Sequence, residues 1–124
     1  MSNLSVRAAT VVPAAELTLL FSDIEGSTNL VREYGREYDQ ILEKHFALLR
    51  TAVTKNHGVE VIAHSDAFFA TFEQASDAVV AAVEIRRAMA GEPWPFGAKV
   101  MVRLGLHTGR PISVSDPKVG YIGI

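Results

Sequence analysis

The segment Leu17-Thr-Leu-Leu-Phe-Ser-Asp-Ile-Glu-Gly-Ser-Thr28 decides the fold of this chain. Residues 16–23 are almost wholly apolar, which predicts a short strand that is covered on both faces. The strand carries one acid, Asp23, at its end, and the Gly-Ser-Thr turn that follows is typical of a helix start. The hydroxyl of Ser27 or Thr28 is expected to cap that helix. The segment therefore predicts a strand, a turn and a helix, with an acid at the junction.

The remaining elements follow from the spacing of apolar residues. Between residues 38 and 53 apolar positions recur every three or four residues, as in an amphipathic helix. Two short strand-like runs flank Asp66 with almost no space between them, which predicts a hairpin. We expect helices at Ser27–Tyr34, Arg36–Asn56 and Ala78–Ala90, strands at Val59–Ala63, Ala67–Phe72 and Lys99–His107, and the start of another element at Gly120–Ile124. This order predicts an α+β sandwich of the ferredoxin-like βααββαβ kind.

The composition indicates one ordinary globular domain. The chain has 124 residues, 48% of them hydrophobic, and a domain of this size buries roughly two-thirds of its unfolded surface. The absence of cysteine excludes disulfides and thiolate zinc sites, and the net charge of −2 argues against a nucleic-acid partner. No apolar run approaches the ~20 residues of a membrane span, and the first residues lack a secretory signal. We therefore expect a cytoplasmic domain at residues 16–124, with no membrane partner, after a flexible lead-in or linker at residues 1–15.

Two acids, Asp23 and Asp66, suggest a site for a metal-bound polyphosphate. Each is expected at the end of a buried strand, and carboxylate oxygens are the ligands that a hard cation such as Mg²⁺ prefers. The helix that follows Asp23 offers free N–H groups and a positive dipole end to phosphates. The pattern therefore indicates nucleotide chemistry. Two simpler interpretations stay open, in which Asp23 caps the helix and Asp66 is a hairpin-turn acid.

Three ordered motifs resemble those of class III nucleotide cyclases, the adenylyl and guanylyl cyclases. Phe21-Ser-Asp-Ile-Glu-Gly-Ser-Thr28 resembles their first metal motif, and Gly58-Val-Glu-Val-Ile-Ala-His-Ser-Asp-Ala-Phe68 resembles their second. Val102-Arg-Leu-Gly-Leu-His-Thr-Gly109 resembles a strand-and-turn motif further along. The resemblance covers residues 16–124 and implies the nucleotide cyclase type of the ferredoxin-like sandwich.

The resemblance also implies a mechanism and a set of site residues. Such enzymes bind a nucleoside triphosphate, here expected to be ATP, with two Mg²⁺ or Mn²⁺ ions at the interface of a homodimer. The ribose 3′-hydroxyl attacks the α-phosphate, and pyrophosphate leaves. Asp23 and Asp66 would be the metal carboxylates, and the backbone carbonyl of Ile24 a further metal ligand. The backbone N–H groups that would hold the β- and γ-phosphates are those of Ile24, Glu25, Gly26, Ser27 and Thr28.

The chain departs from the family pattern near the second acid and in the purine pocket. Ser65 and Ala67 stand where the family usually has glycine, and a Cβ makes a close backbone approach harder. Ile62 and Gly120 fall at the two purine-reading positions, and neither side chain can hydrogen-bond a base edge. The sequence therefore predicts a degenerate purine pocket and gives no preference between ATP and GTP.

The sequence also ends before a catalytic segment that the resemblance implies. In the family an Asn and an Arg that stabilise the transition state follow a segment like Tyr121-Ile-Gly123, and this sequence ends at Ile124. We therefore expect no such catalytic residue within the chain and no cyclase activity from the chain alone, whether by truncation or by natural degeneration. The alternative is a non-catalytic, cyclase-like regulatory or dimerisation module. An unrelated ferredoxin-like binding domain would leave the three ordered motifs unexplained.

Overall fold

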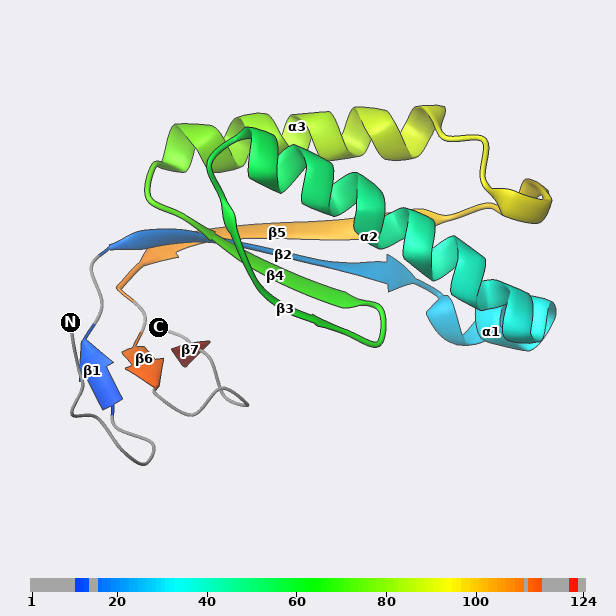
Figure 1. Ribbon diagram of the computed structural model, residues 1–124, viewed down its shortest axis with the longest axis horizontal. Coiled ribbons are helices and arrows are strands. Elements are labelled where there is room, and N and C mark those ends of the chain that lie inside the picture. Colours follow the sequence, from blue (N-terminus) through cyan, green and yellow to red (C-terminus); the bar gives the residue numbers. More distant parts are fainter. Residues whose placement is uncertain (1–10, 14–15, 111, 115–120, 123–124) are drawn as a thin grey trace.

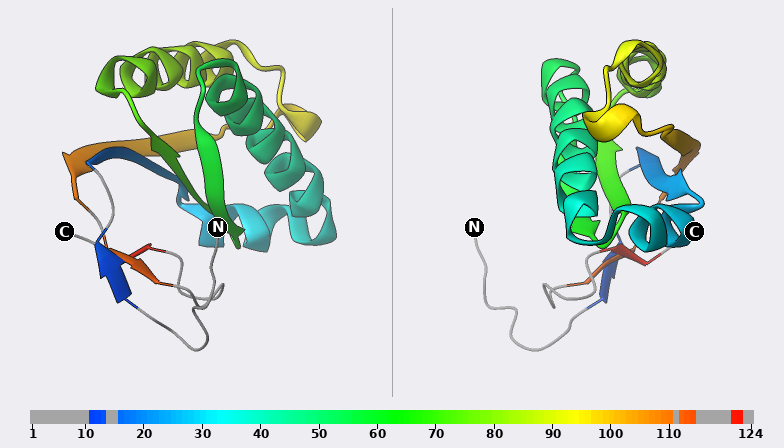
Figure 2. Two further views of the ribbon diagram at one scale, coloured as in Figure 1. Left: turned by 60° about the vertical axis from the view of Figure 1, so that its left-hand side comes forward. Right: turned by 90° about the vertical axis from the view of Figure 1, so that its right-hand side faces the viewer.

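The computed structural model describes residues 11–13, 16–110, 112–114 and 121–122. Two long helices lie against one face of a four-stranded antiparallel sheet with the strand order β3-β4-β2-β5 (Figures 1 and 2). In chain order the elements are β1 (Val11–Pro13), β2 (Leu17–Glu25), α1 (Ser27–Tyr34), η1 (Gly35–Glu37), α2 (Tyr38–Lys55), β3 (Val59–His64), β4 (Ala67–Phe72), α3 (Ala75–Gly91), η2 (Pro95–Gly97), β5 (Met101–Gly109), β6 (Ile112–Val114) and β7 (Tyr121–Ile122). The segment from β2 to β5 has the predicted βααββαβ order, and the expected hairpin is β3–β4.

The alternation of β2 assigns its residues to two different faces. Leu20, Ser22 and Ile24 are buried under the helices, whereas Phe21, which lies between them, is 53% exposed. The prediction that this strand is covered on both faces was therefore wrong at Phe21, although Leu19 on the same face is buried. Below, we call the face opposite the helices the open face of the sheet. Among the described residues no helix covers it.

The core lies between the sheet and helices α2 and α3. Alanines on α3 let this helix approach the sheet closely, and larger side chains from α2 and β4 fill the remaining space. Its fully buried members include Leu20, Ile41, Leu49, Phe68, Ala70, Phe72, Ala78, Ala81 and Ile85. Gly58, after α2, has no room for a side chain, since a Cβ there would lie 2.5 Å from the ring of Phe72 and 2.7 Å from Val53.

Two predicted details differ from the structure. Strand β2 continues two residues past the predicted end, because Asp23, Ile24 and Glu25 pair with β5. Helix α1 begins where expected, but no side chain caps it; its N-cap is Gly26, with a left-handed φ of 67°. The expected Ser27 or Thr28 cap was therefore wrong, and so was the interpretation of Asp23 as a capping carboxylate. Glycine adopts this backbone conformation without the penalty that a Cβ brings.

Both ends of the described chain meet in a second, small sheet. Its strand order is β1-β6-β7, and Figure 1 shows it beside one end of the main sheet. Strand β1 lies within the stretch expected to be a lead-in, and β7 lies within the element expected at residues 120–124. Residues 120, 123 and 124 fall outside the described part. No helix of the described residues is both long enough and apolar enough to cross a membrane.

Candidate functional site

Asp23 lies near the end of β2, on the open face of the sheet. Its cross-strand neighbour on β5 is Arg103. The Arg103 guanidinium donates two hydrogen bonds to the carboxylate, from Nε to Oδ1 at 2.8 Å and from Nη2 to Oδ2 at 2.9 Å. Both side chains are partly exposed, at 39% for the acid and 64% for the arginine. Asp23 is therefore accessible to solvent and oriented by a two-point ion pair.

Asp66 lies in the two-residue turn of the β3–β4 hairpin. Its Oδ2 accepts a hydrogen bond from the backbone N–H of Ile24 at 3.1 Å. Since Ile24 follows Asp23 directly, this bond brings the two acids together although 42 residues separate Asp66 from Ile24. Asp66 thus lies in the hairpin turn and also close to Asp23. Its interpretation as a turn residue and its interpretation as a metal ligand are therefore compatible.

The hairpin turn contains the serine that replaces the family's glycine. Ser65 has a φ of 56°, in the left-handed region where residues with a Cβ are disfavoured. The turn keeps this conformation without glycine, and Asp66 still reaches Ile24. The left-handed backbone of Ser65 therefore costs stability, and Asp66 is still held against Ile24.

The start of α1 offers backbone donors beside the two acids. The N–H groups of Asn29 and Leu30 both donate to the Gly26 carbonyl, at 3.0 and 3.2 Å. Within the described residues, this leaves Ser27 and Thr28 as the helix N–H groups without a backbone acceptor. A Cβ at Gly26 would meet nothing within 4 Å, so the space above this turn is open. An anion could reach these donors, which the helix dipole also favours.

A row of apolar residues crosses the open face next to the ion pair. Ile62 on β3 pairs with Phe69 on β4, and Phe69 pairs with Phe21 on β2. The Phe21 ring continues the row over Gly105 of β5, where a Cβ would lie 2.6 Å from Cζ of the ring. Ile62, a predicted purine-pocket position, thus belongs to a hydrophobic surface beside the acids. Gly120, the other predicted position, lies outside the described residues.

A buried histidine lies behind the site. His45 of α2 is fully buried, and within the described residues neither ring nitrogen has a hydrogen-bond partner. Burial lowers its pKa to about 4, against the opposing attraction of Asp66 and Asp23. The hydroxyl of Ser22, on the helix side of β2, is also buried without a partner. His45 is therefore neutral at physiological pH and contributes no charge to the site.

The donor set near Asp23 fits a hard divalent cation held jointly with a ligand. Among the described residues no group of three or more His, Asp or Glu side chains could hold a metal ion. Two carboxylates and the Ile24 carbonyl supply only part of a coordination shell. Mg²⁺ commonly binds through one or two carboxylates and completes its shell with phosphate oxygens and water. The residues present therefore fit a cation that arrives with a polyphosphate better than a closed metal site.

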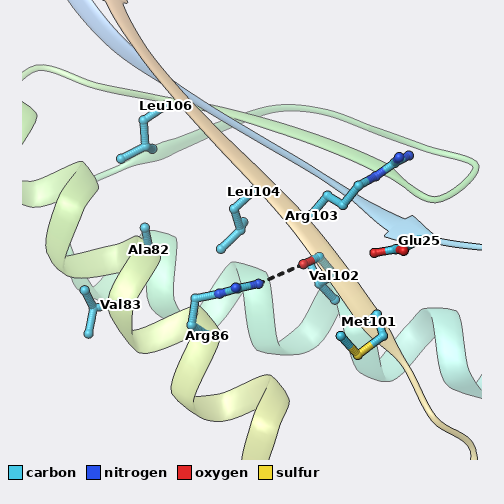
Figure 3. Close-up of a pocket in the computed structure, with 9 residues that line it drawn as sticks. All are labelled: Glu25, Ala82, Val83, Arg86, Met101, Val102, Arg103, Leu104 and Leu106. Atoms are coloured by element: carbon cyan, nitrogen blue, oxygen red, sulfur yellow. Dashed lines mark hydrogen bonds between the residues drawn. The ribbon is translucent and has the colours of Figure 1, made fainter.

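A separate groove lies between α3 and the free edge of β5. It has a volume of about 690 Å³, and Figure 3 shows Arg86 reaching across it to donate to the Val102 carbonyl at 3.0 Å. Arg103 and Glu25 lie at its border, but neither Asp23 nor Asp66 lines it. We therefore assign the chemistry to the open face, where the acids and the helix start meet, and not to this groove.

Two residues of this site were not predicted from the sequence. Arg103 was named only as part of the third motif, although it forms the ion pair with Asp23. Arg103 lies within the third motif, on the strand that pairs with β2. That pairing places the third motif beside the first motif, which contains Asp23. His45 lies within the predicted amphipathic helix, and no pattern in the sequence predicts that its ring lacks hydrogen-bond partners among the described residues.

The chain is similar to known proteins over most of its length. The family model of the adenylate and guanylate cyclase catalytic domain matches residues 10–119. The adenylate cyclase of Mycosarcoma maydis is 29% identical over 133 residues, which cover 90% of this chain and 5% of that protein. An uncharacterized protein of Mycobacterium tuberculosis strain H37Rv is 28% identical over 111 residues, 88% of this chain and 36% of that protein. The chain thus spans a minor part of these relatives.

Solved structures show the same fold. The catalytic core of a rhodopsin-guanylyl cyclase with converted specificity, solved with ATPαS, superposes with a TM-score of 0.79 at 17% identity, covering 93% of this chain and 68% of that one. An adenylate cyclase of Trypanosoma brucei in its monomeric state gives 0.76 at 21% identity, covering 87% and 64%. Together with the family match over most of its length, these similarities show that the chain belongs to the adenylate and guanylate cyclase catalytic domain family.

Proposed function

We propose that this chain provides the metal- and phosphate-binding part of a nucleotide cyclase active site. The reaction converts a nucleoside triphosphate, expected to be ATP, to the 3′,5′-cyclic monophosphate and pyrophosphate. The ribose 3′-oxygen forms a bond to the α-phosphorus, the bond to the bridging oxygen breaks, and the 3′-hydroxyl proton is released. The hydrogen bond from Ile24 N–H to Asp66 carries the proposal, because it brings the two acids to the start of α1.

The residues of this chain would act by binding and orientation. Asp23, Asp66 and the Ile24 carbonyl would hold two divalent ions, Mg²⁺ or Mn²⁺. When bound, such ions lower the pKa of an attacking hydroxyl and offset charge on the phosphoryl oxygens. The free N–H groups of Ser27 and Thr28 would fix the β- and γ-phosphates, so that the α-phosphate faces the acids.

The hydrophobic row beside the acids bears on how the complete site is assembled and on which purine it binds. Phe21, Phe69 and Ile62 offer apolar surface to a purine or to a second protomer and no hydrogen-bonding group to a base edge. Phe21 is 53% exposed and continues the apolar row of Ile62 and Phe69, and a contiguous exposed apolar patch is typical of an interaction surface. We therefore infer that the complete site forms in a homodimer, with little discrimination by Ile62 between adenine and guanine.

Calorimetric titration with a non-hydrolysable ATP analogue and Mn²⁺, repeated with a GTP analogue, tests the proposal. We expect saturable binding that requires Mn²⁺ and is lost in Asp23→Asn. Glu60→Gln is the matched control, because Glu60 forms a similar two-point pair with Arg50, at 2.7 and 3.1 Å, away from the site. Unchanged Mn²⁺-dependent affinity in Asp23→Asn would refute the site. Absence of binding by the unmodified chain would favour a regulatory or dimerisation module.

A further inference from the structure

The two acids of the site are engaged in different ways. Asp66 uses Oδ2 to accept one backbone hydrogen bond, and among the described residues its other oxygen has no hydrogen-bond partner. Asp23 has both oxygens bound by the Arg103 guanidinium, at 2.8 and 2.9 Å. A cation that approaches Asp23 therefore meets another cation on the same two oxygens.

The charges around Arg103 strengthen this arrangement. The hydrogen bond and the charge of Asp23 raise the pKa of Arg103, and the charges of Glu25 and Asp66 raise it further. The guanidinium is thus attracted to the whole acidic cluster. It also keeps its charge at every pH at which the protein is folded.

We propose that Arg103 is the internal counter-ion of the metal-free site and must release Asp23 before a divalent ion can use both oxygens of that carboxylate. The inference rests on the proposed function, because it takes Asp23 as a metal ligand. If Arg103 has this role, the affinity of the site for a metal ion is lower than that of a site with two unpaired carboxylates. In the metal-free protein, the positive charge of Arg103 also reduces the electrostatic repulsion among the acidic residues of the site.

Mn²⁺ titration of the protein without nucleotide, followed by the electron paramagnetic resonance signal of free Mn²⁺, tests the proposal. Arg103→Gln is expected to bind Mn²⁺ about three- to tenfold more tightly than the unmodified protein, as expected for loss of a competing, partly exposed pair. Arg50→Gln is the matched control, since it removes the same charge from a similar two-point pair with Glu60, and its affinity should change less than about twofold. Arg103→Lys keeps the positive charge but loses the two-point guanidinium geometry, so its Mn²⁺ affinity should lie between the affinities of Arg103→Gln and Arg50→Gln.

A second measurement follows the arginine itself. In a nuclear magnetic resonance titration with Mg²⁺, the side-chain Nε–H signal of Arg103 should shift as the ion saturates the site, because its acceptor on Asp23 is lost. The Nε–H signal of Arg50, which donates to Glu60 at 2.7 Å, should not move.

The outcomes separate the two proposals. If Arg103→Gln binds Mn²⁺ no more tightly than Arg50→Gln, while Asp23→Asn abolishes binding, the counter-ion role is refuted and the metal site stands. An Arg103 signal that stays unchanged at saturating Mg²⁺ also refutes the counter-ion role. If none of these proteins binds Mn²⁺ saturably without nucleotide, the counter-ion role is refuted, and the titration with the ATP analogue and Mn²⁺ decides the metal site separately.

Discussion

The two faces of the main sheet use the same strands for different purposes. On the helix side, Leu20 and Ile24 of β2 are almost completely buried in an apolar core. On the open face, one residue away along the same strand, Phe21 is half exposed and Asp23 pairs with Arg103 at the surface. The alternation of a single strand thus separates the residues that stabilise the fold from those that form the site. A substitution on one face should therefore affect stability, and a substitution on the other should affect binding.

The largest expected difference is between Leu20→Ala and Phe21→Ala. Leu20 is fully buried, so its truncation should lower the free energy of unfolding by about 3 kcal/mol through lost burial and a residual cavity. Phe21→Ala should cost less than about 1 kcal/mol, because half of the side chain is already in water. Urea unfolding measures both values. An equal cost for the two substitutions would mean that the open face is covered in solution, and a concentration-dependent midpoint would identify a second copy as the cover.

Lowering the pH should destabilise the fold through the buried His45 on the helix side of the sheet. Because the pKa of His45 is lowered to about 4, the unfolded chain binds more protons than the folded chain between about pH 6.5 and pH 4. The stability contribution of neutral His45 is complete above pH 6.5 and falls as the pH decreases through that window. By pH 5 the loss should reach about 2 kcal/mol. His45→Leu should remove this part of the acid dependence in unfolding measured from pH 4 to 8. The exposed control His107→Gln should keep it, and a His45→Leu profile parallel to the unmodified protein would contradict the assignment.

A pair of glycine substitutions compares how rigid the two faces are. Gly58→Ala places a Cβ 2.5 Å from the buried Phe72 ring, which cannot move without opening the core, so we expect a loss of about 1–3 kcal/mol. Gly105→Ala places a Cβ 2.6 Å from the Phe21 ring, which is exposed and can rotate away, so the loss should be smaller. Thermal unfolding of the two variants gives the comparison. A larger loss for Gly105→Ala would show that Phe21 is held in place on the open face.

The smallest effect is expected at the hairpin turn at the border of the site. Ser65→Gly relieves a left-handed backbone and should raise the free energy of unfolding by about 0.5–1 kcal/mol. Because the turn already places Asp66 against Ile24, Mn²⁺ affinity should stay the same. Denaturant unfolding and the Mn²⁺ titration test the two parts separately. A change in affinity without a change in stability would mean that Ser65 itself contributes to binding.

The sequence predicted the fold well where the pattern of residues is local. The spacing of apolar residues on α2 and the two strand runs around Asp66 predicted the elements and their order, and the structure confirmed both. Element ends were less accurate. Strand β2 is extended by pairing with β5, a long-range contact, and α1 uses a glycine backbone conformation in place of a hydroxyl cap. Neither effect can be read from neighbouring residues alone.

The two acids of the site could be predicted from the sequence, but the residues that surround them were predicted less well. Asp23 and Asp66 were named from their positions at strand ends, and the structure brings them together through Ile24. The ion pair of Asp23 with Arg103 depends on the register of two strands about 80 residues apart, which the sequence motifs do not specify. The exposure of Phe21 was mispredicted, because an apolar strand looks the same in sequence whether its second face meets helices, another chain or water.

The different positions of the two acids in the sheet also set how often each is displaced by thermal fluctuation. Asp23 lies on β2, where it pairs with Arg103 of β5 just beyond the last residue that pairs with β4, so its backbone amide should exchange with solvent more slowly than that of a turn residue. Asp66 lies in the turn of a hairpin whose outer strand, β3, has a partner on one side, so it should open locally and far more often. The complete pair of acids therefore exists only while the hairpin turn stays closed, although Asp23 remains in place throughout. Hydrogen exchange at these two amides would report how much of the time the site is assembled.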